Sequence, residues 1–287
     1  MSTERNVRGE SAHAAPEALA DPREFYDQRF GEGYMTDFST FFEETRLHSV
    51  TAVLAQLRAG GLSPATILDY GCGEGRYIEV LARLFPEAAV AGSDISEVAL
   101  EIARAKHPQA EYTRMADERL ELPSETFDLV TSFEVLEHVK DVELATRELG
   151  RLLKPGGTLV LTTPCANPWS LEWLVNRLTG GLQTSFDGFG RFASDEPGHL
   201  RRLTDADLKS LLERADVHTD RILHGAHLFT TISEFLAVSQ RVPAVVRHRF
   251  NTRVRTWFEK LDWRLFRRLP NGASMVLAGT KRDASSR

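Results

Sequence analysis

Three glycines at alternate positions are the first residues whose spacing suggests chemistry. In "ILDYGCGEGRY" (67–77), Gly71, Gly73 and Gly75 follow a short apolar run and precede a helical pattern. Because glycine has no Cβ, backbone N–H groups there can approach a ligand closely at the start of the helix. The loop is therefore a candidate ligand cradle, although a tight strand-to-helix turn would use the same glycines.

Two acids at the ends of apolar runs limit which ligand the loop can bind. Asp69 ends the first run and Asp94 ends the next one, in "VAGSD". A carboxylate at position 69 repels a pyrophosphate and attracts an ammonium group, while one at position 94 can accept two ribose hydroxyls. A dinucleotide loop of the form G-x-G-x-x-G would need glycine where this chain has Arg76. The pattern therefore disfavours NAD.

Two histidines are candidate general bases, because the unperturbed pKa of histidine suits proton transfer near neutrality. His138 lies in "EVLEHV" and His199 in "DEPGHLRRLT". We expect both to converge above the sheet described below. The alternatives are a helix-surface or packing role for His138 and a loop-pinning hydrogen bond for His199. Arg201 and Arg202 either face an anionic substrate or are solvated.

Metal and disulfide chemistry are not indicated. His224 and His227 are three residues apart, but no nearby cysteine or acid completes a ligand set, so we predict no metal site. Cys72 and Cys165 are the only cysteines of the chain. Two cysteines cannot form a disulfide framework and fit a reducing compartment, which together with the absence of an apolar signal region predicts a cytoplasmic protein.

The elements that must position these groups alternate between short β-type runs and helical patterns from residue 66 to residue 164. Such alternation predicts right-handed crossovers and a parallel sheet. An N-terminal helix stripe precedes the first run, and it consists of Leu47, Val50, Leu54 and Leu57. Further along, Thr204 and Asp207 form a capping-box pair for a helix with Leu208, Leu211 and Leu212 inside.

Two segments interrupt this rhythm. Residues 165–200 are rich in aromatic, glycine and polar residues, which is typical of a lid or a binding surface. Their aromatic side chains either line an apolar pocket or form a small core of their own; they are Trp169, Trp173, Phe186, Phe189 and Phe192.

Residues 241–268 form the second interruption and carry nine Lys or Arg against two acids, a local charge of 9 − 2 = +7 in a chain of −6. Their apolar residues Val254, Phe258, Leu261 and Leu265 predict a basic amphipathic helix. A lid, a homodimer contact and peripheral membrane contact remain open uses of this helix. Nucleic acid is not indicated, because no base-reading module accompanies the charge.

Four stretches occur in a familiar order: Asp-x-Gly-x-Gly-x-Gly at 69–75, "ADERLELP", "FDLVTSFEVLEHV" and "RLLKPGGTLVLTTP". With them the chain resembles the class I, Rossmann-fold methyltransferases that depend on S-adenosylmethionine (SAM), of the small-molecule type. The resemblance covers roughly residues 60–215 and the closing strand. It implies an α/β fold with a single doubly wound seven-stranded sheet, its last strand antiparallel, and helical cap insertions.

The resemblance also assigns expected roles around the cofactor. The three glycines would cradle the methionine part of SAM and Asp69 would lie near its amino group. Asp94 would hold the ribose, with Ile95 beside the adenine.

Three further residues each keep an alternative. Asp117 would bind the adenine amino group or be a solvated turn acid. Glu134 lies where ligands of open α/β sheets collect, or is a helix N-terminal acid. Arg46 would pair with the SAM carboxylate or be an exposed helix arginine.

The expected function is methyl transfer from SAM to a small-molecule acceptor, on oxygen. N- or C-methylation of a small or lipid-like acceptor, and a SAM-binding partner protein without catalysis, are the alternatives. At 287 residues and 42% hydrophobic content the chain can bury a full core. The expected divisions are a mobile leader (1–22), a helical cap (23–61), a methyltransferase domain (62–281) with insertions at about 165–200 and 228–270, and a mobile tail (282–287).

Overall fold

The structure is a computed structural model that describes residues 20–33, 41–193, 195, 198–232 and 252–283. Most of the predicted leader and tail, residues 1–19 and 284–287, lie outside the described residues, as does the segment 233–251 of the second insertion. Among the described helices, none is long and apolar enough to cross a membrane.

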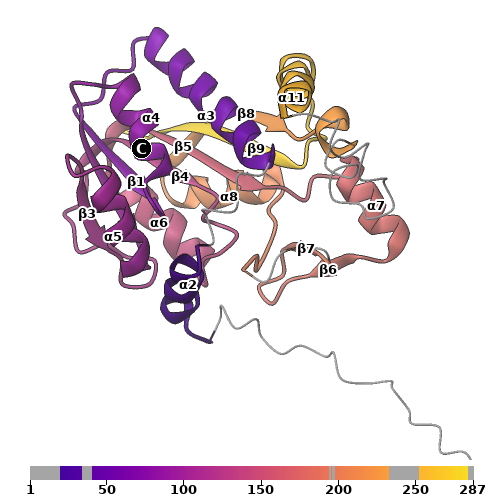
Figure 1. The fold of residues 1–287 in the computed structure, drawn as a ribbon, viewed down its shortest axis with the longest axis horizontal. Helices are drawn as coiled ribbons and strands as arrows, with labels where there is room; N and C mark the ends of the chain where they lie inside the picture. The colour runs from indigo at the N-terminus through magenta and orange to yellow at the C-terminus, as the bar shows by residue number, and fades with distance from the viewer. Residues whose placement is uncertain (1–19, 34–40, 194, 196–197, 233–251, 284–287) are drawn as a thin grey trace, which may run out of the picture.

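The centre of the molecule is one seven-stranded sheet with the strand order β3-β2-β1-β4-β5-β9-β8 (Figure 1). β9 pairs antiparallel with both β5 and β8, and the other neighbours pair parallel. The predicted doubly wound sheet with an antiparallel last strand is therefore confirmed. The strands are β1 (Thr66–Tyr70), β2 (Ala89–Asp94), β3 (Glu111–Arg114), β4 (Phe127–Phe133), β5 (Leu153–Pro164), β8 (Val217–Gly225) and β9 (Ser274–Lys281).

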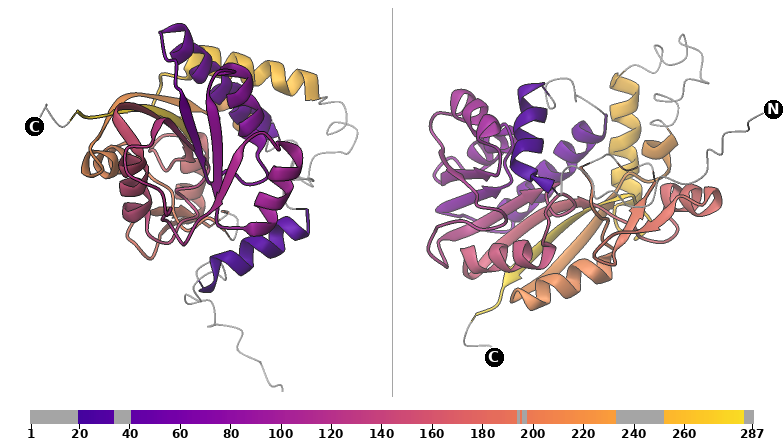
Figure 2. Two further views of the ribbon diagram at one scale, coloured as in Figure 1. Left: turned by 90° about the vertical axis from the view of Figure 1, so that its left-hand side faces the viewer. Right: turned by 90° about the horizontal axis from the view of Figure 1, so that it is seen from below.

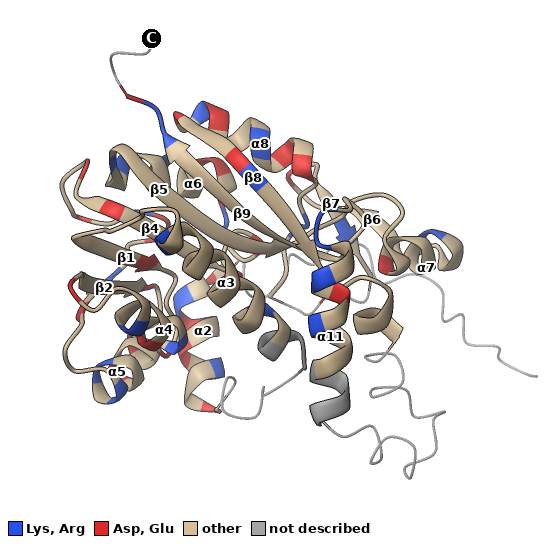
Figure 3. Cartoon of the chain, turned by 90° about the horizontal axis from the view of Figure 1, so that it is seen from above, with Lys and Arg blue, Asp and Glu red and all other residues tan. Residues whose placement is uncertain are grey.

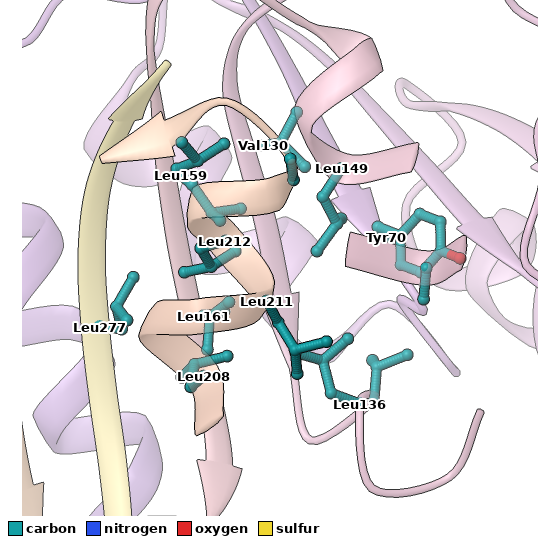
Figure 4. Packing of buried hydrophobic residues seen from close by; sticks show 14 of the residues in the cluster. Tyr70, Val130, Leu136, Leu149, Leu159, Leu161, Leu208, Leu211, Leu212 and Leu277 are labelled. Atoms are coloured by element: carbon teal, nitrogen blue, oxygen red, sulfur yellow. The ribbon is translucent and has the colours of Figure 1, made fainter. Parts of the chain in front are cut away.

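Helices cover both faces of this sheet (Figure 2). On one face α3, α4 and α11 contribute to a shared apolar cluster, and on the other α6 and α8 do so (Figure 4). Strand order reverses between β1 and β4, and in open α/β sheets ligands bind at the carboxyl ends of the strands at such a point. The helices are α2 (Pro22–Gly31), α3 (Phe41–Ala59), α4 (Arg76–Leu84), α5 (Glu97–Lys106), α6 (Val142–Leu152), α7 (Leu171–Thr179), α8 (Asp205–Arg214) and α11 (Thr252–Phe266).

Two helices confirm the sequence patterns in detail. In α3, Val50 and Leu54 of the predicted stripe are fully buried. In α8, the capping box of Thr204 and Asp207 is present, with both reciprocal hydrogen bonds. Burial of one apolar stripe thus fixes each helix against its face of the sheet, and the cap fixes where α8 begins.

The first insertion contains α7 and a small hairpin of β6 (Leu182–Thr184) and β7 (Gly190–Phe192). Its attachment corrects the prediction for the two arginines that follow His199. Arg201 is fully buried and donates to Asp187 and to the carbonyl oxygens of Leu136 and Val139. Neither solvation nor an anionic substrate accounts for this guanidinium, because the insertion and the chain after β4 supply its acceptors.

Arg202 is buried in the same way and also contradicts the prediction. Its guanidinium pairs with Asp195 at 2.6 Å and with Glu172 of α7 at 2.9 Å, and it lies 4.2 Å from the Phe192 ring centroid. These contacts tie α7 and the hairpin to the chain that leads into α8. For Phe192, which is buried there, the small-core alternative is the observed one.

The second insertion contains α11, and its apolar face differs from the prediction. Leu265 is 57% exposed, whereas Trp263 is buried against the core cluster shared with α3. Asp262 is buried beside Trp263 and accepts hydrogen bonds from the N–H and hydroxyl groups of Thr230. The helix is rotated relative to the predicted stripe because a buried acid with two donors takes a position that the pattern assigned to solvent. Figure 3 marks the lysine and arginine residues along its described part.

Candidate active site

The glycine loop joins β1 to α4 and has the backbone shape that only glycine adopts readily. Gly71, Gly73 and Gly75 have φ angles of 75°, 51° and 80°, and a Cβ on Gly71 would overlap the side chain of Val135. The N–H groups of Gly71 and Gly73 donate to Ser93 O and to Asp94 Oδ2. The end of β2 thus takes the hydrogen bonds of Gly71 and Gly73, and the Gly75 N–H donates to Cys72 O. Their expected role in cradling the methionine part of SAM stays a prediction, for which the missing side chains leave space.

Asp69 presents an unsatisfied carboxylate oxygen at the end of β1. Its Oδ1 accepts from Thr131 Oγ1 at 2.7 Å, while its buried Oδ2 has no hydrogen-bond partner among the described residues. Burial raises the pKa of Asp69 to about 7, and the charge of Asp94 adds to the effect of burial against the hydrogen bond from Thr131. A cation at Oδ2 would satisfy both the oxygen and the charge, so Asp69 fits an ammonium group such as that of SAM.

Asp94, at the end of β2, organises the loop as well as facing the site. Its two carboxylate oxygens accept from the backbone N–H groups of Gly73 at 2.8 Å and Ser96 at 2.9 Å. Burial raises its pKa, and these backbone donors oppose the effect. Each carboxylate oxygen has a second lone pair, so Asp94 can still accept ribose hydroxyls. Ile95, the expected adenine neighbour, is partly buried against the main core.

Helix α2, which falls in the expected helical cap (23–61), contacts this end of the sheet. Its Asp27 accepts from the Ser96 hydroxyl at 2.6 Å, and Arg23 approaches Asp117 at 3.6 Å. Asp117 has a φ of 55° and an exposed side chain. Asp117 is thus an exposed turn acid beside α2. This position is compatible with both expected roles, a solvated turn acid and a partner of the adenine amino group. The acidic N-cap and the Pro22 start of α2 were the available signals for this helix.

Glu134 and Arg46 form an ion pair at 2.7 Å beside the end of β4. No helix begins at Glu134, whose φ of 56° turns the chain instead, so the alternative of a helix N-terminal acid is wrong. Arg46 points from α3 into the site and is not an exposed helix arginine. Both line a small cavity of about 30 Å³ together with residues of α3, β5 and β9.

His138 and His199 converge, as expected, and their ring centroids are 4.8 Å apart. His138 Nδ1 is 2.8 Å from Gly198 O, and because a carbonyl only accepts, that nitrogen carries the proton. The other nitrogen, Nε2, faces Glu137 Oε1 at 3.9 Å. His138 lies in a turn and not on a helix surface, and α2 covers it through Tyr26 at a ring separation of 5.8 Å.

Burial and neighbouring charges set the protonation of this group. Burial lowers the pKa of His138 well below its usual value, and His199 adds to the effect. Burial raises the pKa of Glu137 well above its usual value, and the nearby charge of Glu134 adds to it. Asp195, 3.7 Å from His199 Nδ1, has a pKa of about 2, since His199 and Arg202 outweigh the effect of its burial. A neutral imidazole thus stands beside a buried carboxyl group.

Glu137 is the site residue that sequence reasoning missed. Its Oε2 accepts from Thr163 Oγ1 at 3.0 Å, and its Oε1 is buried without a hydrogen-bond partner among the described residues. The signal was present in "EVLEH", where a second acid stands next to His138. We define the acceptor cluster as Glu137, His138 and His199.

His224 and His227, the pair weighed as metal ligands from the sequence, have structural partners. His224 Nε2 lies 2.9 Å from Asp205 Oδ1 and 3.1 Å from Asn167 Nδ2, which joins β8 to the start of α8. His227 contacts Asn271 and the His224 carbonyl. The two rings thus serve separate contacts and do not point to one common ligand.

The class I SAM-dependent methyltransferase fold is defined by this strand order, by the glycine loop after β1 and by the acids at the ends of β1 and β2. The family model described as "Methyltransferase domain" matches residues 42–219, and the chain belongs to this family. The resemblance stated from the sequence motifs is thereby confirmed, and SAM is the cofactor of this class.

Relatives and solved structures agree at the level of the family. A "probable S-adenosylmethionine-dependent methyltransferase" of Mycolicibacterium smegmatis is 32% identical over 165 residues, 56% of either chain. A ubiquinone biosynthesis O-methyltransferase of Alkalilimnicola ehrlichii is 41% identical over 121 residues, 40% of this chain and 48% of that one. The chain thus spans about half the length of these relatives. A SAM-dependent methyltransferase structure from Thermotoga maritima shares the fold, with a TM-score of 0.56, 19% identity and coverage of 90% and 99%.

Proposed function

We propose that the protein transfers the methyl group of SAM to an oxygen atom of a small hydroxylated acceptor. The observation that carries this proposal is the position of the acceptor cluster. Glu137, His138 and His199 gather just past the end of β4, next to the strand whose end carries Asp69 and the glycine loop. The cofactor-binding side and a proton-accepting side thus face the same switch point of the sheet.

Methyl transfer needs alignment and the removal of one proton. SAM supplies a methyl group on a sulfonium, which is already an activated leaving group. The acceptor oxygen forms the new C–O bond, the C–S bond breaks with its electron pair kept by sulfur, and the hydroxyl proton leaves. In the chain, Asp69 orients the amino group, and the acceptor cluster lowers the cost of removing the proton. His138 Nε2, unprotonated in the tautomer that a hydrogen bond to Gly198 O requires, faces Glu137 of this cluster.

Oxygen is proposed as the methylated atom on two grounds. The acceptor cluster is suited to a hydroxyl, which must lose a proton, and ubiquinone biosynthesis O-methyltransferases are among the relatives at 38–41% identity. N- and C-methylation and a SAM-binding partner protein remain distinguishable outcomes of the test below. We further propose that the protein acts in the cytoplasm, where its two buried cysteines stay thiols.

A contact surface on α11 is a separate proposal. Trp257 and Leu265 are 59% and 57% exposed, and Leu269 beyond the helix is 47% exposed. Exposed Lys260 and Arg264 accompany them. Aromatic and basic residues on one helix support peripheral contact with an anionic membrane surface; a homodimer contact is the competing outcome.

The direct test is methyl-labelled SAM incubated with the purified protein and a small-molecule and lipid extract of its host, followed by mass spectrometry. We expect a labelled product whose methyl group is bound to oxygen. A label on nitrogen or carbon would contradict the assignment of the atom. Confirmed SAM binding without any labelled product would favour the non-catalytic alternative.

A further inference from the structure

The acceptor cluster contains more hydrogen-bond-accepting atoms without a donor than a single general base would need. Glu137 Oε1 is buried and has no hydrogen-bond partner among the described residues. His138 Nε2 faces it at 3.9 Å, and the proton of that ring is on Nδ1. With Glu137 ionised, two groups that only accept would point at each other. Such an arrangement is costly unless a positive charge or a proton lies between them.

The surrounding contacts orient the three side chains as they do in metal sites. Ligating histidines usually donate their other N–H to a backbone carbonyl or face a carboxylate, and ligating carboxylates are themselves hydrogen-bonded. His138 Nδ1 donates to Gly198 O, and His199 Nδ1 faces Asp195 at 3.7 Å. Glu137 is held through its other oxygen by the hydroxyl of Thr163.

The distances suit a single ion. One atom each from Glu137, His138 and His199 can be chosen so that all three lie within 4.8 Å of one another. Ligand atoms about 2.1 Å from a common ion lie roughly 3–4 Å apart, so a shift of about 1 Å or less would close the set. The set draws on the turn after β4 and on the end of the first insertion, and the buried ion pairs of Arg201 and Arg202 fix that insertion in place.

We propose that Glu137, His138 and His199 bind one divalent metal ion of the kind represented by Zn²⁺. Two imidazoles with one carboxylate suit Zn²⁺ or Fe²⁺, whereas Mg²⁺ prefers oxygen ligands. Three protein ligands leave an open position, as in catalytic sites. The proposal deepens the proposed function: an ion there lowers the pKa of a hydroxyl that reaches it, which is how the cluster eases loss of the acceptor proton.

Zn²⁺ binding to the full chain, stripped with a chelator and free of SAM and acceptor, tests this proposal by calorimetry. We expect one equivalent to bind and to raise the unfolding temperature, and Glu137→Gln, His138→Asn and His199→Asn to weaken binding at least 10–100-fold. The matched controls Glu213→Gln and His218→Asn, which replace an exposed pair at the opposite end of the strands from the cluster, should bind like the wild-type chain.

Absence of Zn²⁺ binding to the folded wild-type chain would overturn the metal site. Equal weakening in cluster and control variants would also overturn it. Circular dichroism of each variant shows that it is folded, and should one of them unfold, the metal-dependent shift of the wild-type unfolding temperature still decides. A labelled product from metal-free protein would contradict the role of the ion in proton loss while supporting methyl transfer, so the two failures are distinguishable.

Discussion

The cofactor side and the acceptor side of the site are built in different ways. On the cofactor side, Asp69, the glycines and Asp94 lie within one β-loop-α-β stretch. Backbone N–H groups of that stretch hold Asp94, and Thr131 on the adjacent strand β4 holds Asp69. On the acceptor side, His138 and His199 are 61 positions apart in the chain and meet only because the first insertion folds back over β4. A local motif can specify the first arrangement, whereas long-range packing must specify the second.

The same difference appears in the electrostatics. Asp69 is a single buried acid whose unpaired oxygen suits one cation, and this requirement is the same for every acceptor. The acceptor side combines Glu137, two histidines and the ion pairs of Arg202. The comparison suggests that cofactor and acceptor recognition can be changed independently, and the following predictions test that separation from the largest effect to the smallest.

Replacing His138 should have the largest effect. His138→Asn removes the ring nitrogen that faces Glu137 within the acceptor cluster, and we expect turnover to fall about 10²–10⁴-fold. Turnover at saturating SAM, measured on the acceptor found by isotope labelling, gives the result, and His218→Asn is the matched control. Full turnover would show that solvent or the acceptor itself disposes of the proton.

Replacing Arg202 should lower the free energy of unfolding. Arg202→Met leaves Asp195 and Glu172 without their guanidinium partner, and breaking a largely buried pair costs about 3–5 kcal/mol. Urea denaturation measures the free energy of unfolding, and Arg214→Met, at an exposed ion pair, should change it by less than about 1 kcal/mol. Equal values for both variants would mean that Arg202 does not hold the insertion.

The raised pKa of Asp69 predicts a pH-dependent difference in stability. The pKa of Asp69 is about 7 in the folded chain and near 3.8 when unfolded, so between these values the folded state binds the proton more tightly. The stability that this proton contributes is lost as the pH rises through the folded pKa of about 7. Relative to the wild type, Asp69→Asn should therefore gain about 1.4 kcal/mol of unfolding free energy between pH 6 and pH 8 without cofactor. A difference that stays constant over this range would contradict the buried, cation-seeking state of Asp69.

The smallest expected effect concerns α11, which belongs to neither side of the site. If its surface meets an anionic membrane, Lys260→Ala should weaken sedimentation with anionic vesicles by about 1 kcal/mol, roughly fivefold, at low salt. Exposed Lys209 on α8, at the other face of the sheet, provides the control variant Lys209→Ala. A wild-type chain that does not sediment at low salt ends the membrane proposal and favours a contact between copies.

The fold was predictable because its signals are local. Alternating strand and helix patterns, the stripe with Val50 and Leu54, and the Thr204–Asp207 box depend on neighbours within a few residues. The positions of Asp69 and Asp94 at the ends of β1 and β2 follow for the same reason, while their contacts with SAM stay a prediction.

The acceptor side was only partly predictable, since its determinants are distant in sequence. The burial of Arg201 depends on carbonyls more than 60 residues away, and no pattern near it announces them. The position of α2 over this side depends on contacts such as that of Tyr26 with His138. Trp263 replaces Leu265 in the core because buried Asp262 fixes the rotation of α11, which hydrophobic periodicity alone does not capture.

The separation of the two sides is tested most directly by calorimetric titration of SAM into Asp69→Asn and His138→Asn. We predict that Asp69→Asn weakens SAM binding by about 1–3 kcal/mol, because the cation of the ligand loses its carboxylate, while His138→Asn binds SAM as the wild type does. Unchanged affinity in Asp69→Asn together with a loss in His138→Asn would contradict the assignment of a cofactor side and an acceptor side.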